Sequence, residues 1–201
     1  MNSLLAIDPG ASGGLAWRSN DGTVYAVAMP DGMTATVDTL RSIAASNPGM
    51  RAVMERVGGY MPGNAGPGAV KFARHCGHLE AALYCVGVPV EQVAPQRWML
   101  AVGPLPKGMD AQAKRARKNA IKDAMARRYP HLRVTLATAD ALGILTWATE
   151  GRANPAAAGS VSYPCAQCGK TITAPDQARA VCWDYCSDTC FKAAYATEKT
   201  P

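Results

Sequence analysis

Short apolar runs separated by polar turns open the chain. Residues 4–7, 15–17 and 24–29 are mainly apolar or alternate between apolar and polar positions, which is typical of β-strands. The polar turn Ser19-Asn20-Asp21-Gly22 joins the last two runs. The pattern therefore predicts three consecutive strands that form an antiparallel meander.

Helical spacing of apolar residues dominates the next part of the chain. We expect helices over residues 36–45 and 110–128, and a short helix that begins at Pro95. A further helix follows a glycine- and proline-rich loop at residues 58–68. Its apolar residues recur at spacings of four, three and four: Phe72, Cys76, Leu79 and Leu83.

The remaining strands are shorter, and one more helix closes this part. Strands are predicted at residues 52–55, 86–93 and 134–136. Thr138 is the predicted N-cap of the last helix, which would place Ala141, Leu145 and Ala148 on one face.

This order of elements indicates a mixed α/β domain over residues 1–150. The opening is not the βαβ unit of a dinucleotide-binding fold, and the glycine-rich turn after residue 8 lacks the lysine of a P-loop. Residues 151–162 are rich in small and polar residues and predict a linker. A small cysteine-rich module is expected over residues 163–201.

Composition limits the possible function classes. The chain has 201 residues, of which 48% are hydrophobic and 18% charged, so it can bury a core. The net charge of +6 favours an anionic partner. The N-terminal apolar stretch is too short for a secretory signal, and no window has the length of a membrane span. We therefore expect a cytoplasmic location.

Three carboxylates occupy unusual positions. Asp8 and Glu55 each end an apolar predicted strand, and Asp140 lies in the first turn of an apolar predicted helix, a position that favours the ionised form. Taken singly, each acid could be an ordinary turn or cap residue. Three converging carboxylates would repel one another unless cations neutralised them, and hard oxygen ligands select Mg²⁺ or Mn²⁺. Two such ions roughly 3.5–4 Å apart can hydrolyse a phosphodiester.

The motifs around these acids resemble a known family. The order Ile7-Asp8-Pro9-Gly10, Met54-Glu55 and Ala139-Asp140-Ala141-Leu142 resembles the RuvC-like Holliday junction resolvases of the ribonuclease H-like superfamily, especially those of phages. The resemblance covers roughly residues 3–150, including the Pro95-Gln96-Arg97-Trp98 stretch and a lysine-rich helix that ends in Tyr129-Pro130.

The resemblance implies a five-stranded mixed sheet flanked by helices, a homodimer, and Mg²⁺-dependent nicking of four-way DNA junctions in a bacterial or phage-infected cell. It also implies that Asp8, Glu55 and Asp140 are the catalytic metal ligands. The chain departs from the family at one point. A fourth ligand usually stands three or four residues before the last carboxylate, but Leu136, Ala137 and Thr138 occupy this region here.

Basic residues suggest where DNA would lie. Two helix faces are candidates for backbone contact, and for each the alternative is an ordinary solvated face: Lys71, Arg74, His75 and His78 on one helix, and Lys114, Arg115, Arg117, Lys118 and Lys122 on another. Tyr60 and Met61 could insert into a junction, or could belong to an ordinary turn. Trp98 is expected in the core.

The cysteine pattern predicts a structural Zn²⁺ site. Two closely spaced pairs supply four thiolates: Cys165 and Cys168, then Cys186 and Cys190. Cys182 is an alternative to Cys190. The module resembles small treble-clef or ribbon fingers. Cys76 and Cys85 are expected to be buried hydrophobes.

The sequence therefore favours a metal-dependent endonuclease for branched DNA with an accessory zinc module. A branched-DNA-binding protein without catalysis is the first alternative, and a phosphotransferase with a ribonuclease H-like fold is the second.

Overall fold

The structure is a computed structural model of the chain and describes residues 3–56, 66–108, 110–150, 162–164 and 171–173. The chain divides into two compact units, Met1–Ala153 and Asn154–Pro201. No helix within these described ranges is long and apolar enough to cross a membrane.

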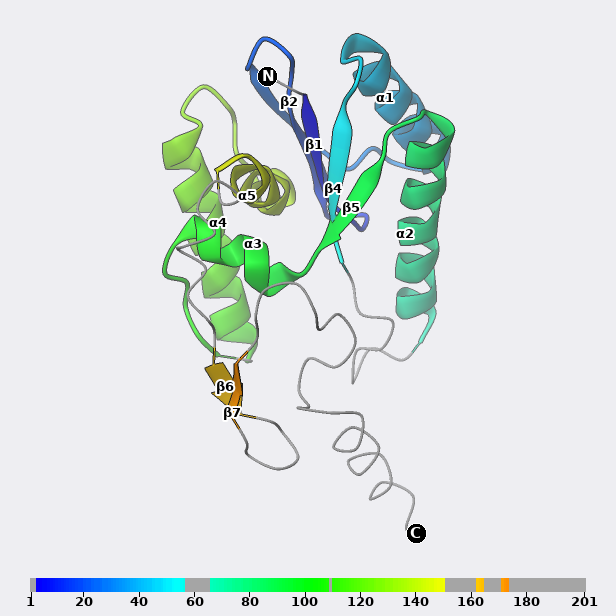
Figure 1. The fold of residues 1–201 in the computed structure, drawn as a ribbon. Coiled ribbons are helices and arrows are strands. Elements are labelled where there is room, and N and C mark those ends of the chain that lie inside the picture. Colours follow the sequence, from blue (N-terminus) through cyan, green and yellow to red (C-terminus); the bar gives the residue numbers. More distant parts are fainter. Residues whose placement is uncertain (1–2, 57–65, 109, 151–161, 165–170, 174–201) are drawn as a thin grey trace. The chain divides into compact units, whose positions relative to one another are not determined.

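Five strands of the first unit form one mixed sheet in the order β3-β2-β1-β4-β5 (Figure 1). The predicted meander is confirmed, because β2 pairs antiparallel with both β1 and β3. β4 pairs parallel with β1 and with β5. The strands are β1 (Leu4–Asp8), β2 (Gly14–Arg18), β3 (Val24–Ala28), β4 (Arg51–Glu55) and β5 (Val90–Val93).

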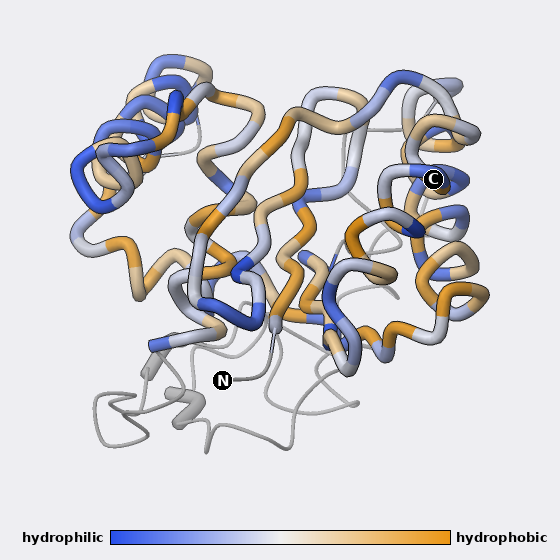
Figure 2. The backbone as a smooth tube through the Cα atoms, turned by 90° about the horizontal axis from the view of Figure 1, so that it is seen from above, coloured by the Kyte–Doolittle hydropathy of each residue, from blue (hydrophilic) through white to orange (hydrophobic). Residues whose placement is uncertain are grey.

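Helices cover both faces of this sheet. One face carries α1 (Met33–Ser46) and α2 (Pro67–Cys85), and the other carries α3 (Pro95–Val102), α4 (Ala111–Arg128) and α5 (Leu136–Glu150) (Figure 1). Seen from above, the strands between them are largely hydrophobic (Figure 2). The mixed α/β prediction is therefore confirmed.

β1 supplies side chains to two cores. Leu4 and Ala6 pack with α3, α4 and α5, whereas Leu5 and Ile7 pack with α1 and α2. Successive side chains of a strand point to opposite faces of the sheet. Because both faces are covered, the apolar run at residues 4–7 needs no polar position.

α5 is the central helix of its layer. It packs on β1 and β2 and contacts α3 and α4 on its flanks. The predicted apolar face of Ala141, Leu145 and Ala148 is buried, but residues 138–148 are buried all round. The helix is therefore buried on all sides and not only along the predicted apolar face.

Two predictions about the start of α5 are wrong. Residues 134–136 form no strand, and Thr138 lies inside the helix instead of capping it. The N–H groups of Thr138 and Ala139 both donate to the carbonyl of Thr135, at 3.2 and 3.0 Å, so the helix begins at Leu136. Thr138 Oγ1 accepts a hydrogen bond from the N–H of Thr135 at 3.0 Å.

Two smaller expectations change, and a third is confirmed. The strand predicted at residues 86–93 is confined to β5, because the N–H groups of Val86 and Val88 bond to carbonyls of α2 at 3.1 and 2.9 Å. Cys85, at the end of α2, is exposed, and Cys76 is only half-buried. The helix predicted at residues 110–128 is confirmed, with Asp110 as its cap: its Oδ1 accepts from the N–H of Ala113 at 2.8 Å.

Gly14→Ala should destabilise the fold by about 1–3 kcal/mol. A Cβ at residue 14 would lie 2.4 Å from the carbonyl oxygen of Ala137 and 2.8 Å from that of Val27, and backbone atoms cannot move aside cheaply. Urea unfolding measures the loss. Gly77→Ala is the matched control: its Cβ would meet nothing within 4 Å, and alanine is the better helix former. Equal unfolding midpoints for the two variants would contradict the close approach of β2 to α5.

Within the described residues, the second unit contains a hairpin in which β6 (Ser162–Pro164) pairs antiparallel with β7 (Thr171–Thr173). The predicted zinc ligands Cys165, Cys168, Cys186 and Cys190, and the alternative Cys182, lie outside the described residues. The predicted linker at residues 151–162 also lies outside them, except for Ser162, which begins β6. The zinc site stays a prediction.

Candidate active site at the edge of the sheet

The fold brings the three predicted carboxylates to one place. Asp8 is the last residue of β1 and Glu55 the last of β4, and these strands are parallel neighbours, so their carboxyl ends share one edge of the sheet. Asp140 reaches the same place from α5, which packs on β1 and β4. The carboxyl groups of Asp8 and Glu55 lie close enough for each to perturb the pKa of the other, and the charge of Asp140 acts on both.

Burial makes these carboxyl groups weak acids. It raises the pKa of Asp8 to about 7, with the charge of Asp140 as the second cause, although Lys118 and the hydrogen bond from Glu55 act in the opposite direction. Burial, followed by the charges of Asp8 and Asp140, raises the pKa of Glu55 to about 8. The cluster therefore holds protons near neutral pH in the absence of a cation.

Asp140 departs from the sequence-based expectation. It lies in the second turn of α5 because the helix begins at Leu136, and burial raises its pKa. Its carboxyl group is thus not held in the ionised form by a helix N-terminus, an effect that fades beyond the first turn. The desolvation of the carboxyl group, which raises its pKa, is the dominant effect at this position.

The side chain of Lys118 places a positive charge beside this cluster. Its Nζ lies 3.6 Å from Oδ2 of Asp140 and lowers the pKa of both Asp140 and Asp8. Its side chain is 56% exposed, against 12% for that of Asp140. The sequence pointed to Lys118 only as a DNA contact, because no local spacing links it to a residue 22 positions later. A DNA-binding role for it stays a prediction.

The other basic residues of α4 do not form one uniform face. Lys114 and Arg115 are exposed. Arg117 donates to the carbonyls of Pro106 and Gly108 at 3.2 and 2.6 Å, and Lys122 pairs with Asp123 at 3.6 Å. Arg117 thus ties the segment before α4 to the helix.

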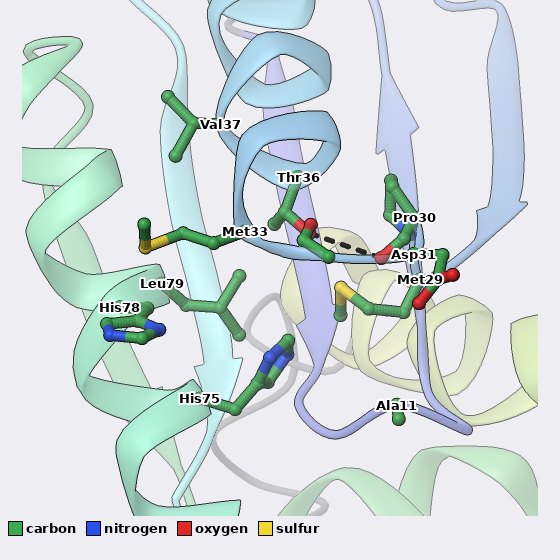
Figure 3. A pocket seen from close by; sticks show the side chains of 11 residues that line it. Ala11, Met29, Pro30, Asp31, Met33, Thr36, Val37, His75, His78 and Leu79 are labelled. Atoms are coloured by element: carbon green, nitrogen blue, oxygen red, sulfur yellow. Dashed lines mark hydrogen bonds between the residues drawn. The ribbon is translucent and has the colours of Figure 1, made fainter. Parts of the chain in front are cut away.

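The basic residues of α2 divide in a similar way. Lys71, Arg74 and His78 are exposed, whereas His75 is half-buried and its Nε2 has no hydrogen-bond partner. His75 points into a cavity of about 300 Å³ between α2 and the start of α1, lined also by Ala11 of the turn that follows Asp8 (Figure 3). Burial, and then the charge of His78, lower the pKa of His75, so it is a poorer phosphate ligand than a charged histidine. Tyr60 and Met61 lie outside the described residues.

The donor set suits a hard divalent cation, since three carboxylates offer six oxygens to Mg²⁺ or Mn²⁺. As the side chains stand, however, no three His, Cys, Asp or Glu residues of the described ranges are arranged as a metal-binding group. Burial and mutual charge raise the pKa values of Asp8 and Glu55, and Lys118 pairs with Asp140. The three carboxyl groups are therefore partly neutralised without a metal ion. Residues 136–138 add no acidic or histidine ligand.

Trp98 adds a further polar group that the sequence did not suggest. The indole is fully buried, which confirms the expected core position. Its N–H lies near enough to Glu55 to lower the pKa of that carboxyl group. A tryptophan in an apolar helix gives no sequence signal for such a role.

Comparisons with known proteins give a fold likeness at low similarity. No protein-family model and no curated protein sequence matches the chain. The chain is similar to the structure of Thermus thermophilus RuvC in complex with a Holliday junction substrate, at 18% identity and a TM-score of 0.49, over 76% of this chain and 96% of that one. It is also similar to a second Thermus thermophilus RuvC structure, at 19% identity and a TM-score of 0.45, with the same coverage. Values this low leave the chemistry to be argued from the residues of this chain.

Proposed function

We propose that the chain is a divalent-metal-dependent nuclease that acts on branched DNA. The observation that carries the proposal is the burial of Asp8, Glu55 and Asp140 together at one edge of the sheet. Burying carboxylates side by side is unfavourable for folding, and such groups with perturbed pKa values gather at functional sites. The cluster is therefore the functional site from which the proposal is built.

Each residue of the cluster has a role in this proposal. Asp8, Glu55 and Asp140 would hold the metal ions, with water in the positions that residues 136–138 leave open. The bound ions would activate a water molecule and stabilise the leaving oxygen of a phosphodiester. Asp8 and Glu55 would have to lose the protons that their raised pKa values favour in order to hold a cation, and Lys118 lies where it can neutralise charge beside Asp140.

The finer specificity rests on the motif resemblance and on charge. Four-way junctions as substrate, Mg²⁺ as cofactor and a homodimer that makes paired nicks follow from the resemblance of the segments around Asp8, Glu55 and Asp140. The net charge of +6 and the exposed Lys71, Arg74, Lys114 and Arg115 suit a polyanionic substrate.

A cleavage assay with four-way, three-way, flap and linear DNA, with and without Mg²⁺ or Mn²⁺, tests the proposal. We expect nicking of branched substrates that requires the cation. Cleavage that continues in a chelator would contradict the metal requirement, and equal cleavage of linear DNA would contradict the preference for branches.

The missing fourth ligand favours one alternative, a branched-DNA-binding protein without catalysis. The pairing of Lys118 with Asp140 also fits it, because the cluster is then neutralised without a metal. Tight junction binding with no nicking at any Mg²⁺ or Mn²⁺ concentration would support this alternative.

Lys118→Met should reduce cleavage by about tenfold, because Asp140 loses the charge that favours its ionised form. Single-turnover cleavage and the salt dependence of junction binding separate its two possible roles. Lys114→Met, an exposed lysine of the same helix, is the control. If Lys118 is only a phosphate contact, both variants will lower the salt slope by about one and affect cleavage equally.

The cysteine-rich unit is proposed to bind one structural Zn²⁺ through Cys165, Cys168, Cys186 and Cys190. Elemental analysis of the purified chain should give one zinc per chain, and Cys165→Ser should lose it. If Cys190→Ser keeps its zinc and Cys182→Ser loses it, the alternative pairing through Cys182 is correct.

A further inference from the structure

The indole N–H of Trp98 is a buried donor without a partner. The side chain has no exposed surface, and Nε1 makes no hydrogen bond. Leaving such a donor unsatisfied costs about 1–3 kcal/mol, and buried orphans of this kind are rare in folded proteins. A phenylalanine would fill an apolar core without this loss.

The fold holds this indole beside Glu55. Glu55 pairs with Val93 in the sheet, and the N–H of Arg56 donates to the carbonyl of Val93 at 2.6 Å. α3 begins two residues after Val93 and carries Trp98 in its first turns, in the same core as Val93. Val93 therefore joins the strand end that carries Glu55 to the helix that carries Trp98.

Helix α5 fixes the orientation of the ring. A Cβ at Gly143 would lie 2.8 Å from Cζ3 and 3.0 Å from Cε3 of Trp98, so the helix packs against the indole without any side chain between them. The N–H is thereby held at one place in the core, whereas the flexible side chain of Glu55 beside it can change rotamer. In the structure Glu55 lies beside Asp8, whose charge raises its pKa.

We propose that Trp98 is a positioning residue for Glu55: its fixed N–H donates to one oxygen of the Glu55 carboxylate and so orients the other oxygen for a divalent cation. The inference rests on the proposed metal-dependent function. An ionised carboxylate is an acceptor only, so it can satisfy the orphaned donor as well as bind a cation. Carboxylates that bind metals are commonly held by such outer hydrogen bonds, whose loss weakens metal affinity by about 10–100-fold.

Trp98→Phe tests this role, because it removes the donor and keeps an aromatic ring; the loss of ring volume is matched in a control at another buried tryptophan. Binding of Mn²⁺ to the full chain is measured by electron paramagnetic resonance without DNA, together with thermal unfolding without metal. We expect roughly tenfold weaker Mn²⁺ binding and a loss of thermal stability no greater than that of the control. Trp147→Phe, a buried tryptophan of α5 that lies under Arg97, is the matched control and should bind Mn²⁺ as the wild type does.

The outcomes separate this inference from the proposed function. Unchanged Mn²⁺ affinity in Trp98→Phe overturns the positioning role alone, as does an equal loss in both variants that follows their loss of stability. A wild-type chain that binds no Mn²⁺ or Mg²⁺ overturns both proposals. Weaker Mn²⁺ binding in Trp98→Phe supports the positioning role even if no DNA substrate is cleaved.

A measurement on the wild-type chain decides the matter if Trp98→Phe does not fold. The indole ¹H–¹⁵N signal of Trp98 is assigned by elimination with phenylalanine variants of Trp17, Trp147 and Trp183. Saturating Mg²⁺ should move this signal downfield, as a new hydrogen bond requires, and leave the others in place. A Trp98 signal that does not move overturns the inference.

Discussion

Asp8→Asn is expected to reduce cation-dependent cleavage of branched DNA by about 1,000-fold or more while junction binding is retained. The substituted asparagine would keep the size of the side chain but could not supply a negatively charged ligand to the cluster. The loss should appear in single-turnover cleavage at saturating protein, whereas electrophoretic mobility shifts in the presence of Ca²⁺ report binding.

Asp38→Asn is the matched control for this prediction. Asp38 is an exposed carboxylate on α1 that pairs with Arg41 at 3.1 Å, outside the cluster. The control variant should cleave as the wild type does. Undiminished cleavage by Asp8→Asn, or an equal loss in both variants, would remove Asp8 from the proposed active site.

The second large effect is a loss of stability with rising pH in the absence of divalent cations. The pKa of Asp8 rises from 3.8 to about 7 on folding, and that of Glu55 from 4.5 to about 8. Between about pH 4 and pH 8 the folded protein therefore binds more protons than the unfolded chain. The free energy of unfolding falls across this window, because the contribution of a raised pKa is complete below the unfolded value and is lost as pH passes the folded value.

The expected decrease is on the order of several kcal/mol, since each pKa unit corresponds to about 1.4 kcal/mol. Urea unfolding at pH 5 and pH 8, with a chelator present, measures it. Asp8→Asn should be more stable than the wild type at pH 8 and should show a shallower pH dependence, and Asp38→Asn should keep the wild-type slope. Mg²⁺ should restore stability at pH 8 only to chains that bind it. A wild-type free energy of unfolding that rises from pH 5 to pH 8 would contradict burial of the cluster.

Local patterns in the sequence are enough to predict most of the fold. The apolar runs at residues 4–7 and 52–54 predict strands that are covered by helices on both faces. The helical spacing of apolar residues predicts α2 and α4. Both signals are local, because they reflect which neighbouring positions are buried. The boundaries were less well predicted. Thr138 is a residue type that commonly caps helices. The N-cap, however, is the residue whose carbonyl accepts the first hydrogen bonds of the helix, and here that residue is Thr135.

By itself, the sequence determined the order of the sheet strands and helices apart from one predicted strand at residues 134–136 that does not form. It also singled out Asp8 and Glu55 at the ends of apolar strands and Asp140 within an apolar helix. Only the tertiary structure decided their chemical state. Their raised pKa values come from desolvation and mutual charge, and the partners Lys118 and Trp98 approach them from other helices. Such terms depend on distances between residues far apart in the chain, which no local spacing encodes.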